Sequence, residues 1–260
     1  SKLSKLIILV AFLASGFLAV PKTSQAYNVF QLFNNVRIFQ GQSVQVFRPW
    51  MCGTDTVTYG GQTYQTVLIG TQCWFKENLN AGTMVTSYGS APCIQVSAGV
   101  WSCQTNNSQI EKYCYSNTSS NCNTDGGLYE WAEMMALPYT CNTTDCSGSI
   151  NSPHQGICPS GWHIATDAEW TTLTDYLTAN SRYWCGGSGT QIAKSLASTD
   201  AVAPNWTNSS TACQVGNDRN NLPQNATGFT ALPAGTRNTT GTFDTRAGSS
   251  YMWSASQYFA

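Results

Sequence analysis

The chain carries little charge. Only 10% of its 260 residues are Asp, Glu, Lys or Arg, and the formal net charge is −1. The lysines and arginines stand singly, so there is no basic stripe of the kind that follows a phosphate backbone. Nucleic acid is therefore not an expected partner. Ser, Thr, Asn, Gln and Gly must cover the surface instead, which suits a protein outside the cell.

The sequence also lacks the common motifs of metal sites and enzymes. It has two histidines, His154 and His163, and no C-x-x-C pair, so a zinc knuckle is not expected. No nucleophile elbow, phosphate-binding glycine loop or H-E-x-x-H is present. His163 is the one candidate base within a motif, and a hydrogen-bonded structural histidine is the simpler interpretation. We therefore expect a non-enzymatic protein without a cofactor or a metal.

Two acidic or oxygen-rich groups have equally simple structural interpretations. Asp167 and Glu169 lie at an expected helix start, where their charge complements the helix dipole. The segment Asn217–Asn221 is rich in oxygen ligands, so a calcium site there stays an alternative to a plain loop. The Glu-Pro-Asn and Gln-Pro-Asp tripeptides of calcium-dependent lectins are absent.

Eleven cysteines in a non-repetitive chain indicate an oxidising compartment. Spacing alone does not determine their connectivity, but three short loops favour local pairs. Because the number is odd, at least one thiol is free or bonded outside this chain. The local candidates are Cys141 with Cys146, Cys114 with Cys122, and Cys93 with Cys103.

N-x-[ST] sequons are frequent in this Asn-, Ser- and Thr-rich chain. They arise by chance in such a composition, or they carry glycans that shield loops and solubilise a weakly charged surface. The candidate sites are Asn106, Asn117, Asn142, Asn205, Asn208, Asn225 and Asn238.

The N-terminal segment has two interpretations. Lys2 and Lys5 precede an apolar run, Leu6–Val20, and Ser24–Ala26 fits a small-x-small cleavage site, the layout of a secretory signal peptide. The run is shorter than the ~20 residues that a transmembrane helix needs. If it is retained, it needs an apolar environment, either a membrane or the core of an assembly. In a filament subunit the segment would lie in a membrane only before assembly.

An amphipathic continuation supports the second interpretation. Apolar residues within Tyr27–Phe39 recur at helical spacing. An apolar helix, a nearby proline and a globular head are similar in layout to type IV pilin-like subunits, although Lys5 stands where those usually carry Glu. We expect residues 1–40 to form a helix and residues 41–260 a globular domain. The expected assembly residues are Leu6, Ile7, Ile8, Leu9, Val10, Phe12, Leu13, Phe17, Leu18, Val29, Leu32, Phe33 and Val36.

Local patterns predict short strands and two or three helices in the domain. Ser43–Phe47 alternates as a strand, and Thr56–Ile69 reads as a hairpin around Gly60–Gly61. Gly127–Leu137 predicts a short helix with Leu128, Trp131, Met134 and Met135 inward.

Thr166–Glu169 is a capping box that opens a helix to about Ala179. Gln191–Ser198 is a further helical candidate, and Thr227–Trp253 predicts short strands with glycine turns. The polar loops 80–125 and 138–160 need disulfides to be ordered. Most tryptophans, including Trp74, Trp162, Trp170 and Trp253, are expected in the core.

Three segments, Tyr64–Leu79, Cys158–Trp170 and Gly228–Arg237, follow one another with characteristic aromatic and glycine positions. In this order they resemble the Fibrobacter succinogenes major paralogous domain over residues 52–260. The resemblance implies a secreted or surface protein. It also implies a final strand ending in Cys, which would lie beyond Ala260 and pair with Cys158 or Cys185. The mixture of elements looks like an α+β, C-type-lectin-like fold held by disulfides.

Two functions are expected. The first is a structural one, a subunit of an extracellular filament that polymerises with copies of itself through the N-terminal helix. The alternative is a secreted, lectin-like adhesin that binds polysaccharide. Either protein would work outside the cell or at its surface.

Overall fold

The computed structural model describes residues 36–37, 45–46, 48–86, 93–97, 100–104, 108–187, 189, 191–199, 205–217 and 224–257. The chain divides into two compact units, Ser1–Met51 and Cys52–Ala260. The expected apolar run and the first part of the amphipathic stripe lie outside the described residues. This applies to Leu6, Ile7, Ile8, Leu9, Val10, Phe12, Leu13, Phe17, Leu18, Val29, Leu32 and Phe33.

The described part of the first unit is a strand pair. β1 (Val36–Arg37) pairs antiparallel with β2 (Gln45–Val46), and Val36 lies opposite Val46. The strand expected at Ser43–Phe47 is thus present in part. The helical position expected for Val36 is wrong, because this β-branched residue takes part in a strand ladder.

Two consecutive hairpins open the second unit. β3 (Val57–Tyr59) pairs with β4 (Gln62–Tyr64) across Gly60 and Gly61, which both have positive φ. Glycine accepts this conformation without steric cost, so the expected turn is confirmed. The second expected strand does not continue to Ile69 as one piece. It breaks at Gln65, and β5 (Thr66–Ile69) pairs with β6 (Gln72–Phe75) instead.

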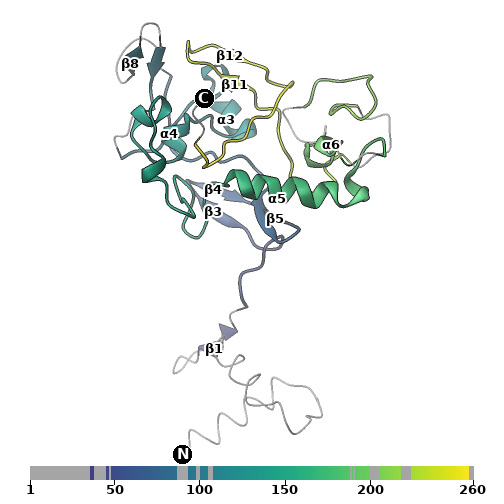
Figure 1. The fold of residues 1–260 in the computed structure, drawn as a ribbon. Helices are drawn as coiled ribbons and strands as arrows, with labels where there is room; N and C mark the ends of the chain where they lie inside the picture. The colour runs from purple at the N-terminus through teal and green to yellow at the C-terminus, as the bar shows by residue number, and fades with distance from the viewer. Residues whose placement is uncertain are drawn as a thin grey trace, which may run out of the picture. The chain divides into compact units, whose positions relative to one another are not determined.

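The longest helix, α5 (Asp167–Thr178), packs against the second hairpin (Figure 1). Its capping box is confirmed: the Glu169 N–H donates to the Thr166 hydroxyl, and the Thr166 N–H donates to the Glu169 carboxylate. Leu173 and Leu177 are buried at helical spacing. They form one hydrophobic core with Ile69, Tyr183 and Phe229.

A second core lies around α4 (Trp131–Met134), which is shorter than the expected helix over 127–137. Met134 and Met135 are buried as expected, but Leu128 precedes the helix and pairs with Tyr113 in a β-bridge. Leu128 is held in this bridge by hydrogen bonds in both directions, and the N-cap residue Glu130 also has an extended backbone, so the helix begins only at Trp131.

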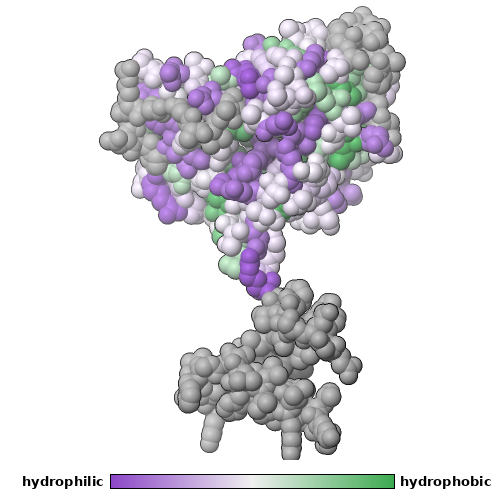
Figure 2. Space-filling view, turned by 180° about the vertical axis from the view of Figure 1, so that it is seen from behind, coloured by the Kyte–Doolittle hydropathy of each residue, from purple (hydrophilic) through white to green (hydrophobic). Residues whose placement is uncertain are grey.

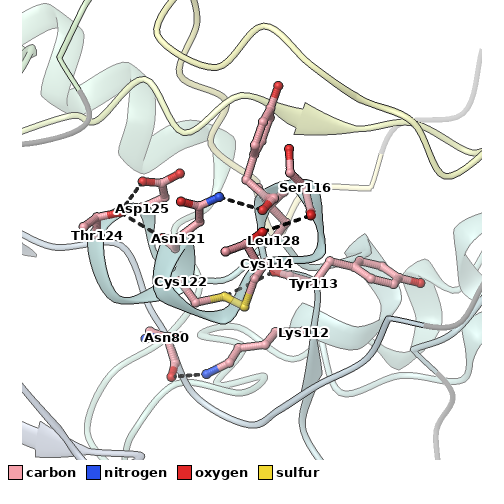
Figure 3. Close-up of a disulfide and its surroundings, with 12 residues drawn as sticks. Asn80, Lys112, Tyr113, Cys114, Ser116, Asn121, Cys122, Thr124, Asp125 and Leu128 are labelled. Atoms are coloured by element: carbon pink, nitrogen blue, oxygen red, sulfur yellow. Dashed lines mark hydrogen bonds between the residues drawn. A yellow bond between two sulfur atoms is a disulfide. The ribbon is translucent and has the colours of Figure 1, made fainter.

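Disulfides hold the polar loops. The three expected local pairs, Cys93–Cys103, Cys114–Cys122 and Cys141–Cys146, are all bonded. Figure 3 shows the Cys114–Cys122 bond tying α3 (Ser119–Asp125) to the residue just before Tyr115, with Asn121 donating to the Tyr115 carbonyl oxygen. Cys52–Cys73 and Cys185–Cys213 are also bonded. Five disulfides indicate a secreted protein that folds outside the cytoplasm.

The bonding of Cys185 corrects one expectation. It was a candidate for pairing with a cysteine beyond Ala260, but its sulfur is bonded to Cys213. Cys158 is free and half-buried. Burial raises the pKa of its thiol to about 12, which keeps the thiol protonated at neutral pH.

The last part of the chain holds few regular elements. β11 (Thr236–Arg237) pairs with β12 (Phe243–Asp244), close after Gly235. Gly235 has a φ of +71°, and a Cβ there would lie 2.5 Å from the Asp244 carbonyl oxygen. Only glycine fits this position, which explains its place within the Gly228–Arg237 segment.

The unit is therefore of mixed α and β structure, with short strands, few helices and several disulfides. One face of it shows mainly hydrophilic and near-neutral residues with small, separate hydrophobic areas (Figure 2). No helix among the described residues is long and apolar enough to cross a membrane. Two further strand pairs are present: β7 (Thr83–Met84) is parallel to β10 (Glu111–Lys112), and β8 (Ile94–Ser97) is antiparallel to β9 (Val100–Ser102). The remaining helix is α6 (Ala193–Leu196). The 3-10 helices are η1 (Tyr115–Asn117), η2 (Tyr139–Asn142), η3 (Ser147–Ser149) and η4 (Ser181–Tyr183).

Candidate functional site

A hollow of about 810 Å³ is lined by Ser102, Tyr113 and four further segments of the chain. The segments are 127–131, 139–143, 235–239 and 251–257, and we call the hollow the aromatic groove. Its volume is in the range of ligand-binding clefts. Its aromatic lining residues are Tyr113, Tyr129, Trp131, Tyr139, Tyr251 and Trp253.

One wall of the groove presents apolar side chains to solvent. Tyr251 is 63% exposed, Met252 40% and Trp253 51%. Trp253 was expected in the core, and this expectation is wrong. Its indole N–H donates to the Tyr129 carbonyl oxygen at 2.8 Å, so the ring is held in place while half of its surface remains accessible. A fixed aromatic ring of this kind contributes contact area without a large loss of conformational entropy.

Two other indoles hold the backbone of this wall. The Trp170 N–H donates to the Trp253 carbonyl oxygen at 3.2 Å, and the Trp131 N–H donates to the Ser254 carbonyl oxygen at 2.8 Å. The first bond connects α5 to the last described segment of the chain, and the second connects α4 to the same segment. The wall is therefore positioned by long-range hydrogen bonds and not by a strand.

The Glu130 carboxylate is the polar centre of the groove. One oxygen accepts the Tyr113 hydroxyl at 2.8 Å, and the other accepts the Ser102 hydroxyl at 2.6 Å and the Asn142 amide at 3.0 Å. The Glu130 N–H donates to the buried side chain of Gln104. Burial, and then the charge and hydrogen bond of Glu130, raise the pKa of Tyr113, which therefore stays a neutral donor.

Arg237 lies over the ring face of the same tyrosine. Its guanidinium carbon is 3.9 Å from the centre of the Tyr113 ring, a cation–π contact. Glu130 and Arg237 are the only charged residues in the lining of the groove as far as the chain is described. Tyr113 thus connects them, through its hydroxyl to the anion and through its ring face to the cation.

Gln257 fixes the rim next to the Cys141–Cys146 disulfide. Its amide nitrogen donates to the carbonyl oxygens of Cys141 and Thr144, at 3.0 and 2.9 Å, and its amide oxygen accepts the Cys146 N–H at 2.8 Å. These three bonds tie the 141–146 loop to the wall. We conclude that Gln257 supports the shape of the groove and has little capacity left for a ligand.

The candidate base from the sequence has a structural role. The His163 ring nitrogen Nε2 is 2.8 Å from the Glu169 carboxylate, which also closes the capping box of α5. Burial alone would raise the pKa of Glu169, but the hydrogen bonds from Thr166 and His163 outweigh it and lower the pKa. Asp167 lies in the first turn of the same helix, as expected. None of these three residues lines the groove.

The oxygen-rich segment at 217–221 is described only at its first residue. Asn217 is buried, its side-chain amide donates to the Thr211 carbonyl oxygen at 2.6 Å, and its own carbonyl accepts the buried Lys194 ammonium. An ammonium group at this carbonyl opposes a calcium ion there. Residues 218–221 lie outside the described residues. Within the described ranges, no three His, Cys, Asp or Glu side chains come together as a metal site.

The sequons fall into three groups. Asn106 lies outside the described residues, and Asn225 is half-buried with its amide bonded to Thr230. The others are exposed, and two of them line the groove, Asn142 and Asn238. The exposed sequons are Asn117, Asn142, Asn205, Asn208 and Asn238.

Sequence reasoning missed the centre of the site. Glu130 and Tyr113 belong to no motif, and their meeting depends on a fold that no local pattern reveals. Arg237 had a signal, because it ends the Gly228–Arg237 segment. The exposure of Trp253 had none, since an indole in a short apolar stretch is more often buried.

Comparison with known proteins identifies the family. The family model of the Fibrobacter succinogenes major domain matches residues 67–260, which include all three characteristic segments except the first residues of the first one. Comparison with curated proteins and with solved structures gives no match. Since the family model covers most of the chain, this protein belongs to the Fibrobacter succinogenes major domain family.

Proposed function

We propose that the Cys52–Ala260 unit is a non-enzymatic, extracellular carbohydrate-binding module and that the aromatic groove is its binding site. The observation that carries this proposal is the exposure of the hydrogen-bonded Trp253 side chain. Its side chain is 51% exposed in the groove although its only polar atom is already hydrogen-bonded. A fixed indole whose free surface is its apolar ring face offers a platform for stacking, not for hydrogen bonding.

The remaining lining residues suit the edges of a sugar. A pyranose ring has apolar C–H faces and a rim of hydroxyl groups, so it needs an aromatic platform with polar groups beside it. Tyr251 and Trp253 supply the platform, and Asn142 and the threonines at 236 and 239 supply polar atoms. Apolar walls with a few placed polar groups are typical of small-molecule sites. The five disulfides support a function outside the cytoplasm. We also propose that the unit has the C-type-lectin-like fold expected from the sequence.

Replacing Trp253 by alanine should weaken glycan binding about tenfold or more, because the stacking surface is lost. The full chain is first screened on an array of neutral and acidic polysaccharides, and the strongest hit is titrated calorimetrically. Trp253→Phe should restore part of the affinity, since it keeps an aromatic face.

Leu68→Ala is the matched control, since Leu68 is a 57% exposed apolar residue on β5 that does not line the groove. It should leave affinity unchanged. Affinity that is equal in the wild-type protein and Trp253→Ala, or an array without any hit, would contradict the proposal.

The apolar run Leu6–Val20 favours a second function, a subunit of a cell-surface filament assembled through its N-terminal segment. A charge in a helix core disfavours packing, so Val10→Asp should abolish filaments that the unaltered chain forms, as judged by electron microscopy. Gln42→Asp is a control outside the run and the amphipathic segment. Normal filaments from Val10→Asp would rule out this mode of assembly.

A further inference from the structure

The charges of the aromatic groove compensate each other within a single contact chain. Arg237 stacks on the Tyr113 ring with its guanidinium carbon 3.9 Å from the ring centre, and the Tyr113 hydroxyl donates to Glu130 at 2.8 Å. Since these are the only charged side chains in the described lining, the groove has one positive charge over the face of the Tyr113 ring and one negative charge at its hydroxyl. The lining as a whole is neutral.

Glu130 is committed to the protein. Its carboxylate accepts hydrogen bonds from Ser102, Tyr113 and Asn142, so most of its acceptor positions are used. Asn142 in turn caps α4 through its amide oxygen, which accepts the Ala132 N–H at 2.8 Å. The negative charge is therefore fixed at the centre of the groove and cannot turn away from a ligand.

We propose that the groove is selective for neutral polysaccharides and rejects acidic ones such as polyuronates. This inference rests on the proposed carbohydrate-binding function and specifies its substrate class. An acidic sugar placed on the Trp253 platform would bring a carboxylate close to Glu130, where the two like charges repel. The acidic sugar would also lose its hydration on binding. The cation in the described lining, Arg237, lies in the same contact chain as Glu130, so the sugar would gain little in return. A neutral sugar meets neither cost.

Binding of the neutral ligand should also be insensitive to salt. Screening by salt weakens interactions between exposed charges, whereas stacking and hydrogen bonds to hydroxyl groups change little. We expect the dissociation constant to change by less than about twofold between 50 and 500 mM NaCl.

The test compares two ligands that differ only at C6, which is a carboxylate in one and a neutral hydroxymethyl group in the other. The full chain is titrated with polygalacturonate and with its carboxyl-reduced form, a galactan of the same linkage, and the comparison is repeated for other polyuronates and their reduced forms. The reduced, neutral forms should bind at least tenfold more tightly, with the salt independence given above. Tighter binding of a polyuronate that salt abolishes would overturn the selectivity and leave the carbohydrate-binding function intact. If neither form bound in any pair, both the selectivity and the carbohydrate-binding function would be contradicted.

Two variants separate the charge from the shape of the groove. Glu130→Gln removes the negative charge from the described lining and keeps Arg237, so affinity for polyuronate should rise at least tenfold, and this gain should disappear at high salt. Because Glu130 also anchors three donors, a second variant is chosen at an exposed rim position. Thr239→Lys adds a cation to the lining without removing any of these hydrogen bonds. It should produce the same gain, and Thr239→Ser should produce none. The absence of a gain in Thr239→Lys would contradict the electrostatic basis of the selectivity.

Discussion

Replacing Arg246 by alanine should lower the free energy of unfolding by about 3 kcal/mol. The guanidinium of Arg246 makes a two-pronged ion pair with Asp125, at 2.7 and 3.0 Å. The Asp125 side chain is only 2% exposed, so the variant leaves a buried carboxylate without its counter-charge. The Arg246 side chain is 31% exposed, and water will partly replace it, which places the cost at the lower end of the range for broken buried pairs.

This ion pair connects two distant parts of the fold. Asp125 ends α3, where it also accepts the Thr124 hydroxyl (Figure 3), and Arg246 follows β12 in the segment that returns to the groove. Urea denaturation with the disulfides intact measures the loss. Arg182→Ala is the control, because Arg182 is exposed and bonds only the hydroxyls of Tyr176 and Tyr183 among its described contacts. A loss no larger than in the control would show that the Asp125 pair does not stabilise the fold.

Glu133→Gln should stabilise the protein at pH 8 by up to about 3 kcal/mol and have almost no effect below pH 4.5. Burial raises the pKa of Glu133 from its ordinary 4.5 to about 7, the Glu111 N–H offsets part of this, and the charges of Glu111 and Glu130 add to it. Glutamine keeps an acceptor for the Glu111 N–H, which donates to Glu133 at 2.8 Å. It removes only the buried charge.

The direction of the pH dependence follows from proton binding. Between pH 4.5 and 7 the folded protein holds a proton on Glu133 that the unfolded chain has lost, so wild-type stability falls as the pH rises through this window. Above pH 7 the full cost of the buried carboxylate is present. Comparing the unfolding free energies of the two proteins at pH 4, 6 and 8 isolates this group from all others. A difference that does not vary with pH would show that Glu133 ionises freely in the folded state.

The parts of the fold that the sequence predicted correctly are local. The capping box of Thr166 and Glu169, the glycine turn at 60–61 and the three short disulfide loops each depend on residues within about a dozen positions. In these segments, backbone sterics, helix capping and loop closure act over the same distance as the pattern itself.

The errors occur where distant contacts override the local pattern. Leu128 has a helical context in the sequence, but its bridge to Tyr113 prevents the helix from starting before Trp131. Val36 fits a helical stripe, yet it pairs with Val46. In both cases the backbone pairs with a distant segment, which satisfies its hydrogen-bonding groups in place of a helical turn.

The sequence by itself determined the family, the oxidising compartment, the main helix and the turns of the first hairpin. These depend on residue types and short spacings. Only the tertiary structure decided that Trp253 is exposed and that Glu130, Tyr113 and Arg237 meet in one groove. The physical reason is the separation of the partners: the bonds from Trp253 to Tyr129 and from Trp131 to Ser254 span 124 and 123 residues. Contacts over such distances arise from the packing of the whole domain, which no periodicity or motif encodes.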